Sequence, residues 1–387
     1  MKYLGRFVYE IFLILCAVLL IKTAHFLYNE DRSTALSGPL LRQDLLERRA
    51  YLLQELEGFS LEKMPSFIPD QFKEEWAIGT LSMTTAALAN LAYEFPETRA
   101  QSVQAIEAMT ALMLQPELRN FELRAWGIDA LNALDTDYGQ IGYLGHLNFM
   151  LSALRLLGGG ESHQELFDRI TAALARRMET APSHYLETFP GVIFTADNMV
   201  VLASIANYDR VHGPKHANLI ARWVKATREK VCEERSGMIP FYVNIEGRGL
   251  GVPRGSGVGW NSFYLPFIDQ SLADEQYALM KQLFLRRLPF GFAAFREYLP
   301  TDSGGADIDS GPVIFGLSTS GTGFGLAGAH RHQDVEVESG ILRTAEFVGT
   351  SIGGDHRRYL LAPLVGDAIM LAMRTARPWD RRFLKKD

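Results

Sequence analysis

The chain has 387 residues, of which 47% are hydrophobic and 22% charged, a globular composition with enough apolar material for a large core. Its formal net charge is −6, and no cluster of lysine and arginine is interleaved with aromatic residues, so nucleic acid is not expected as a partner. Only two cysteines are present, Cys16 and Cys232. They lie in different parts of the chain, and no intramolecular disulfide is expected.

The first thirty residues differ from the rest. An uninterrupted apolar run extends from Ile11 to Ile21, and Phe7–Tyr28 reaches the roughly 20 residues that a helix needs to cross a bilayer. Basic residues precede the run, acidic residues follow it, and no convincing small-residue cleavage site comes after it. We therefore expect a single-pass signal anchor over residues 1–30. The remaining residues, 31–387, are expected to form one domain on the exported, periplasmic or other extracytoplasmic side.

The body of the chain reads as one helix after another, with apolar residues at three-and-four spacing. Two kinds of helix alternate. Amphipathic helices with a charged face for solvent are expected at 41–56, 97–114, 162–179, 215–233, 274–287 and 333–348. Nearly uncharged helices rich in Ala, Gly and Ser, which must be buried on every side, are expected at 76–93, 141–157, 196–208, 259–268, 310–330 and 363–375.

The buried helices begin about 50 to 65 residues apart, the spacing of a repeated unit that buries its face on its neighbours. Six buried helices and six amphipathic ones predict an all-α (α/α)6 barrel, a closed double ring of helix hairpins, because no polar capping helix of an open superhelix is present. The segment 310–330 is apolar enough to be considered as a second membrane span, but it fits the repeat.

The loops that lead into the buried helices are long and polar, whereas the connections at the other end, such as Phe95–Pro96, are short. All inner helices of such a ring point the same way, so the long loops share one end, where function is expected to concentrate. The candidate residues at the helix starts are Tyr143, His146, Asn148, Asp197, Trp260 and Asp309. Those in the loops are Tyr185, Glu187, Arg254, Ser256, Arg296, Glu297, Tyr298 and Asp307.

Several of these candidates have structural alternatives. Asp197 and Asp309 occupy positions typical of helix N-caps, His146 is equally well a satisfied core residue, and Arg296 with Glu297 is equally well a loop salt bridge. Glu187 lies among aromatic residues, where desolvation raises a carboxyl pKa toward the range of a general acid. We therefore expect Glu187 and Asp197 to transfer protons, with His146 positioning the substrate and the other candidates binding it. His330 and His332 lie at the far end of a buried helix, and no metal site is expected.

Two segments resemble the linalool dehydratase/isomerase family: Tyr-Leu-Gly-His-Leu-Asn-Phe-Met at 143–150 and Tyr-Asp-Arg-Val-His-Gly at 208–213. The resemblance extends over residues 76–213. It implies an exported (α/α)6 barrel that isomerises and dehydrates small terpene alcohols by acid–base chemistry without a cofactor. The family's active-site histidine falls on His146, whereas its two active-site cysteines fall near Thr188 and Asp197. The family's N-terminal aspartate and tyrosine have no convincing counterparts.

The leading hypothesis is thus an exported, cofactor-free acid–base enzyme, a hydro-lyase or isomerase acting on a small organic alcohol. A carbohydrate-active enzyme, either a glycoside hydrolase or a polysaccharide lyase, is an alternative, since paired carboxylates and aromatic residues also suit sugars. A non-catalytic ligand-binding or scaffold protein of the cell envelope is the second alternative. Expected partners are a small-molecule substrate and the membrane, and a homo-oligomer is left open.

Overall fold

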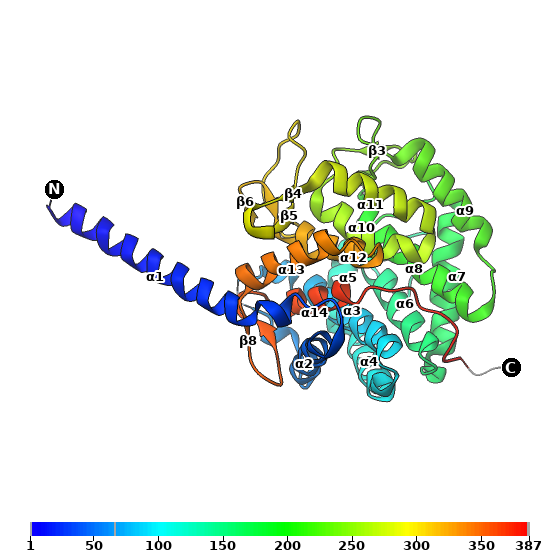
Figure 1. The fold of residues 1–387 in the computed structure, drawn as a ribbon. Coiled ribbons are helices and arrows are strands. Elements are labelled where there is room, and N and C mark those ends of the chain that lie inside the picture. Colours follow the sequence, from blue (N-terminus) through cyan, green and yellow to red (C-terminus); the bar gives the residue numbers. More distant parts are fainter. Residues whose placement is uncertain (1, 66, 385–387) are drawn as a thin grey trace.

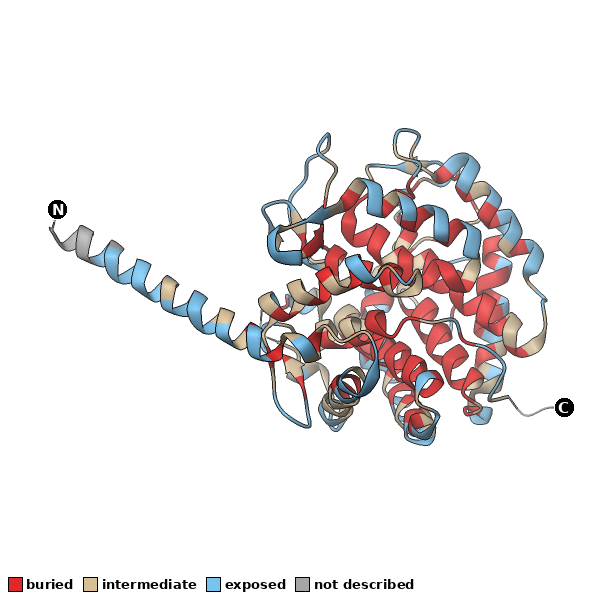
Figure 2. Cartoon of the chain, in the orientation of Figure 1, coloured by how far each residue is buried: buried red, intermediate tan, exposed pale blue. Residues whose placement is uncertain are grey.

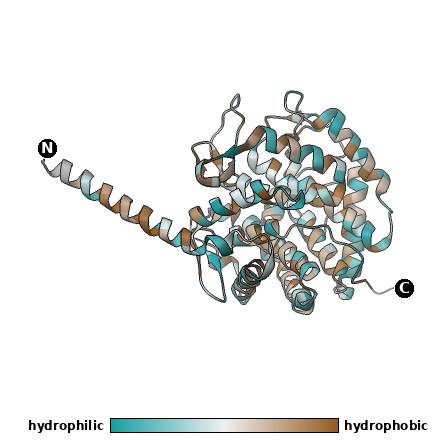
Figure 3. Ribbon diagram, viewed as in Figure 1, coloured by the Kyte–Doolittle hydropathy of each residue, from teal (hydrophilic) through white to brown (hydrophobic). Residues whose placement is uncertain are grey.

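The computed structural model describes residues 2–65 and 67–384. Its first helix, α1 (Lys2–Ser33), projects away from the body of the protein (Figure 1). Hydrophobic residues cover most of its free part (Figure 3). Among the described residues, α1 is the one helix long and apolar enough to cross a membrane, and only 6% of its most apolar window is buried. Residue 1, which belongs to the expected anchor, lies outside the described residues.

Six buried helices form the inside of the body. Each contacts the next along the chain, and the last contacts the first, so the six close into a ring. Figure 2 shows them almost wholly buried toward the core. They are α3 (Asp70–Glu94), α6 (Ile141–Leu156), α8 (Thr195–His212), α10 (Gly255–Ile268), α12 (Thr319–Arg331) and α14 (Leu364–Arg374).

Glycines allow some of these helices to approach closely. A Cβ atom on Gly259 of α10 would lie 3.0 Å from the carbonyl oxygen of Gly321 on α12, and one on Gly145 of α6 would lie 3.0 Å from Val201 of α8. Any larger residue would push these helix pairs apart. The small-residue composition that marked the inner helices in the sequence therefore has a packing cause.

The outer helices alternate with the inner ones and cover them. Each packs against one or two neighbouring inner helices and exposes its outward side (Figure 2). They are α2 (Gly38–Leu56), α4 (Arg99–Met113), α7 (Gln164–Thr180), α9 (Ala217–Ala226), α11 (Gln270–Phe284) and α13 (Val335–Gly349). The predicted all-helical architecture of paired helices is thus confirmed, with a closed cycle of inner contacts.

The remaining elements are short and occupy the connections. They are the helix α5 (Asn120–Trp126), a π-helical turn at Thr227–Val231, and 3-10 turns at Leu61–Lys63, Pro96–Thr98, Pro116–Arg119, Glu161–His163 and Pro289–Gly291. Antiparallel strands of two or three residues form four small sheets. In the first, β2 (Tyr242–Val243) pairs with both β1 (Ile193–Phe194) and β3 (Gly249–Leu250). In the others, β4 (Leu285–Arg287) pairs with β5 (Ala293–Phe295), β6 (Val313–Ile314) with β7 (Leu317–Ser318), and β8 (Ser351–Ile352) with β9 (Arg358–Tyr359). All four sheets lie in loops that precede an inner helix. We call this end of the ring the loop-rich end.

Two predicted helices include residues that form strands instead, and others begin several residues before their predicted starts, such as α3 at Asp70 rather than at Trp76. The segment 310–318 forms the β6–β7 hairpin, and α12 begins only at Thr319, because Gly316 has a φ of 78° that makes a turn and the Ser318 side chain caps the amide of Gly321. The outer helix predicted to end at Arg287 ends at Phe284 instead. Its last three residues pair with β5 as strand β4, which satisfies their backbone groups against a neighbouring loop.

Candidate functional site

Three carboxylates from separate inner-helix segments influence one another at the loop-rich end. Glu75 lies in α3, Asp197 in the first turn of α8, and Asp309 in the loop before α12. The negative charges of Asp197 and Asp309 both raise the pKa of Glu75, and the charge of Asp309 raises that of Asp197. Because α3, α8 and α12 are alternate members of the ring, these groups interact across its axis. Asp197 and Asp309 were among the candidates expected to meet at this end and Glu75 was not, and the prediction that the whole set of candidates lines one pocket stays a prediction.

The pKa of each of the three carboxyls is shifted toward neutral pH. Burial raises the pKa of Glu75 to about 7 and that of Asp197 to about 6, and the neighbouring carboxylates add to both shifts. Desolvation together with the charge of Asp307 raises the pKa of Asp309 to about 6. Glu75 and Asp197 nevertheless retain partial contact with solvent. Carboxyl groups with such pKa values can give or take a proton near neutral pH.

Asp197 accepts a hydrogen bond of 2.7 Å from the hydroxyl of Thr188, which lowers its pKa and partly offsets the effect of burial. Thr188 belongs to the loop before α8, so the loop and the helix hold the carboxylate between them. Thr188 and Asp197, near which the resemblance places the family's two cysteines, are therefore in direct contact. The N-cap role considered as an alternative for Asp197 is excluded, because α8 begins at Thr195 and its N-cap residue is Phe194.

His146 and Trp260 lie near the start of α8, the turn that carries Asp197. The Nδ1 atom of His146 lies 2.9 Å from the hydroxyl of Ser82 on α3, and burial lowers the pKa of the imidazole to about 4, so the ring is neutral at physiological pH. Its centroid lies 6.0 Å from that of Trp260, whose indole N–H donates to the carbonyl of Ala196 at 3.1 Å. Trp260 is thereby fixed beside the start of α8, and the neutral histidine can position a substrate without carrying charge.

A second cluster adjoins the first and is built around Arg254. The Nε–H of Arg254 donates to Glu297 at 2.7 Å, and its two terminal nitrogens donate to the two oxygens of Asp307 at 2.7 Å each. Glu297 is fully buried and also accepts from the amide and the hydroxyl of Ser256. The guanidinium lies over the ring of Tyr298, with 5.7 Å to its centroid. These bonds brace the loops before α10 and α12 against each other.

Arg296 and Asp309 do not fill the structural roles considered as alternatives for them, and their predicted role in substrate binding stays a prediction. The Arg296–Glu297 salt bridge proposed as an alternative does not form, because Glu297 pairs with Arg254 and the Nε of Arg296 has no hydrogen-bond partner among the described residues. Asp309 is not an N-cap, since α12 begins ten residues later and is capped by Ser318. Its carboxylate is thus available to the cluster around Glu75.

Three candidates point away from the axis. The hydroxyl of Tyr143 donates to the carbonyl of Met113, the amide nitrogen of Asn148 donates to hydroxyls of α7 and α8, and the hydroxyl of Tyr185 bonds to Thr227. All three side chains are at most 2% exposed. They fasten the inner layer to the outer one, and the structure does not bring them together with the carboxylates.

Glu187 is held by its own loop. Its Oε1 accepts from the amide of Gly191 at 3.1 Å, and its main chain packs against Gly139, where a Cβ atom would lie 1.9 Å from the Glu187 carbonyl oxygen. The side chain is half-buried. Its neighbour Thr188 reaches Asp197, so Glu187 lies at the edge of the cluster. Its predicted role in proton transfer stays a prediction.

Sequence reasoning missed Glu75, Ser82 and Glu122. Glu122, on α5, is buried, accepts from the amide of Tyr143 at 3.1 Å, and has its pKa raised to about 8 by burial. Glu75 comes directly before Trp76, the first residue of the predicted buried helix, and its position ahead of an apolar run was the available signal. The sequence did not distinguish Glu122 from a surface glutamate, because α5 is too short for its residue pattern to show which face is buried.

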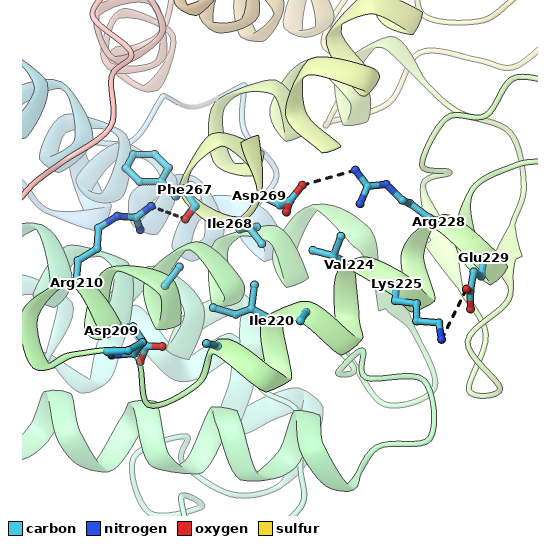
Figure 4. Close-up of a pocket in the computed structure, with 14 residues that line it drawn as sticks. Asp209, Arg210, Ile220, Val224, Lys225, Arg228, Glu229, Phe267, Ile268 and Asp269 are labelled. Atoms are coloured by element: carbon cyan, nitrogen blue, oxygen red, sulfur yellow. Dashed lines mark hydrogen bonds and ion pairs between the residues drawn. The ribbon is translucent and has the colours of Figure 1, made fainter. Parts of the chain in front are cut away.

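A separate surface groove of 790 Å³ lies between α8, α9 and α10, toward the opposite end of α8 (Figure 4). Its rim carries the ion pairs of Arg228 with Asp269 and of Lys225 with Glu229. Asp209, which also lines it, is twelve residues beyond Asp197, or about 18 Å along a helix with a rise of 1.5 Å per residue. The groove therefore does not reach the carboxylate cluster. At that same end, His330 and His332 bind two different carboxylates, Glu338 and Asp274.

Comparison with known proteins shows that this part of the molecule resembles one known family. Residues 130–313 match the model of the linalool dehydratase/isomerase family, whereas no curated protein matches the chain. The matched region extends a hundred residues beyond Gly213, where the resemblance found in the sequence ended, and does not include the expected portion from Trp76 to residue 129. It contains His146, Thr188 and Asp197 but not Glu75. The central part of this chain, from residue 130 to residue 313, resembles linalool dehydratase/isomerase.

Proposed function

We propose that the protein is an acid–base lyase or isomerase that dehydrates or rearranges a small unsaturated alcohol of the terpenoid type, without a cofactor. The observation that carries this proposal is the pair Glu75 and Asp197, with pKa values of about 7 and 6, in which the negative charge of Asp197 helps to raise the pKa of Glu75. At neutral pH such a pair holds a protonated acid beside an ionised base, which is the arrangement that elimination of water requires. The family resemblance supports the same class of reaction.

The reaction begins with proton transfer from Glu75 to the hydroxyl oxygen of the substrate. The carbon–oxygen bond then breaks, and water leaves with the bonding electron pair. The carbocation that remains is allylic, and the face of Trp260 can stabilise it by a cation–π interaction. The Asp197 carboxylate removes a proton from the neighbouring carbon, and the electrons of that carbon–hydrogen bond form the new double bond. Return of the proton from Asp197 to Glu75 closes the cycle.

Isomerisation uses the same groups. Water re-adds to the other end of the allylic cation, and the proton that it releases returns to the carboxylate that donated first. The neutral imidazole of His146, oriented by Ser82, contributes a hydrogen bond to the hydroxyl group without competing for the proton. The Arg254 cluster positions the loops around the substrate.

We infer further that α1 anchors the protein in a membrane with the body on the exported side. The length and apolar composition of α1 support this location, as does the order of charges around its apolar run. The body would then meet its substrate outside the cytoplasm.

The variant Asp197→Asn tests the chemistry, because it keeps the shape of the side chain and removes its ability to take a proton. With linalool and related allylic alcohols as substrates, and gas chromatography of the alkene and isomeric alcohol products, kcat should fall about a hundredfold or more. The matched control is Asp274→Asn on the outer helix α11, which should leave kcat unchanged. Full turnover by the Asp197 variant would contradict the mechanism, and failure of the wild-type protein to convert any of these alcohols would contradict the substrate class.

A further inference from the structure

The direction of α1 relative to the ring is fixed by its contacts with α13. Glu30 pairs with Arg343, and the Lys22 Nζ atom donates to the carbonyl of Val348 at 3.2 Å and to the hydroxyl of Thr350 at 2.8 Å. The two helices therefore run antiparallel, and the N-terminal part of α1 leaves the body where α13 ends. Since the end of α13 leads through β8 and β9 into α14, this is the loop-rich end of the ring. Figure 1 shows α1 extending past that end.

The contact between α1 and the body, which we call the joint, is buried and includes both polar and apolar side chains. Phe26 is 5% exposed and packs against Phe292 and Phe347, with ring centroids 5.5 and 5.9 Å away. Further along α1, Asn29 and Ser33 accept hydrogen bonds of 3.0 and 2.7 Å from Arg357. A helix held on several sides in this way keeps its orientation. The loop-rich end must consequently face whatever surrounds the N-terminal part of α1.

Exposed apolar side chains gather on the loops next to this joint. Phe290, at the tip of the β4–β5 hairpin, is 85% exposed, and Phe315, at the tip of the β6–β7 hairpin, is 99% exposed. The two hairpins are linked by a bridge between Arg296 and Leu317. We define the bilayer-facing patch as Phe290, Ile314, Phe315, Val348, Leu360 and Leu361, each of which is at least 49% exposed.

Both tip phenylalanines have a left-handed backbone, with φ of 61° at Phe290 and 51° at Phe315. A bulky residue is disfavoured in this conformation, where Gly or Asn is the usual choice. Each tip thus carries an aromatic ring that its turn geometry disfavours and that packing does not cover. Aromatic side chains are enriched where a protein meets the membrane interface, which offers such rings an apolar environment.

We propose that the loop-rich end of the ring docks onto the lipid bilayer that α1 crosses, with Phe290 and Phe315 inserted at the interface, so that the carboxylate site opens toward the membrane and takes a lipophilic substrate from it. This inference rests on the proposed function for the anchor and for the substrate class. The lipid bilayer is the occupant because α1 leads from the patch into the apolar run Ile11–Ile21, within a helix long and apolar enough to cross a membrane.

The test places a fluorescent probe at three positions of the full-length protein in vesicles of phosphatidylcholine and phosphatidylglycerol. Cys16 and Cys232 are first replaced by Ser, and single cysteines are then introduced by Phe315→Cys, Leu15→Cys and Val335→Cys for labelling with an environment-sensitive dye. Val335 begins α13 at the opposite end of the ring and is 60% exposed, so it is the matched control. Lipids that carry a nitroxide at a shallow or a deep position report the depth of each dye.

The dye at position 315 should shift its emission to the blue and be quenched several-fold more by shallow nitroxide lipids than the dye at position 335. The dye at position 15 should be quenched most by the deep nitroxide. If position 315 behaves like position 335 while position 15 is quenched, the docking is refuted and the anchor stands. If position 15 is not quenched by either lipid, the anchor itself is refuted.

Discussion

Replacing Glu75 by Gln should stabilise the protein at alkaline pH and leave its stability unchanged in acid. The folded protein raises the pKa of this carboxyl from its ordinary 4.5 to about 7, so the folded state binds the proton more tightly than the unfolded chain does. Stability from this group is therefore fully present below pH 4.5 and is lost as the pH rises to about 7. Above that pH the folded protein holds a charged carboxylate near Asp197 and Asp309, whereas a glutamine there is neutral.

The size of the gain in stability follows from the two pKa values of Glu75, 4.5 ordinarily and about 7 in the folded protein. Their difference corresponds to about 3 kcal/mol of unfolding free energy, since one pKa unit is about 1.4 kcal/mol. Glutamine resembles the protonated carboxyl in shape, so the variant should match the wild type near pH 4.5 and gain up to about 3 kcal/mol near pH 8. The same substitution should abolish most of the turnover, because it removes the proposed proton donor.

Thermal unfolding of the full-length protein in detergent, measured from pH 4.5 to pH 8.5, is the assay. The difference in melting temperature between Glu75→Gln and the wild type should be near zero at the acid end and rise to several degrees at the alkaline end. The control, Glu229→Gln, lies on the exposed surface beside the groove of Figure 4 and should show no such rise. A variant that is destabilised to the same extent at every pH would refute the idea that burial and neighbouring charge strain the Glu75 carboxylate.

Two further predictions concern the loop before α8. Thr188→Val removes the hydrogen bond that lowers the pKa of Asp197. The acid limb of the pH profile of kcat should therefore move to higher pH by about one unit, because a hydrogen bond to a charged group is worth about 1.5 kcal/mol. An unchanged profile would contradict a role for Asp197 as the base. Glu187→Gln keeps an oxygen that can accept a hydrogen bond from the amide of Gly191, so we expect turnover to change less than tenfold. A hundredfold loss of kcat at an unchanged melting temperature would instead assign proton transfer to Glu187, as the sequence predicted.

The sequence by itself determined the architecture. The distribution of charged residues distinguishes the two layers, because a helix without charged residues must be buried and an amphipathic one must face water. The spacing of the buried helices along the chain indicates the repeat. The long apolar run at the N-terminus likewise identified α1 as a helix long and apolar enough to cross a membrane. These properties are local in the sequence, and they can be recognised without knowing which helices are in contact. The boundaries failed at 310–318 and at 285–287, where pairing within a short local hairpin overrode the helical pattern.

Only the tertiary structure decided which side chains meet. Asn148 lies two residues from His146, or about 200° around a helix, and so faces the outer layer while His146 faces the axis. Glu75 becomes a partner of Asp197 because closure of the ring brings two alternate helices to a shared axis, although more than one hundred residues separate them in the chain. The pKa of a carboxyl depends on burial and on charges brought near from elsewhere, and those are properties of the packed ring that no local pattern contains.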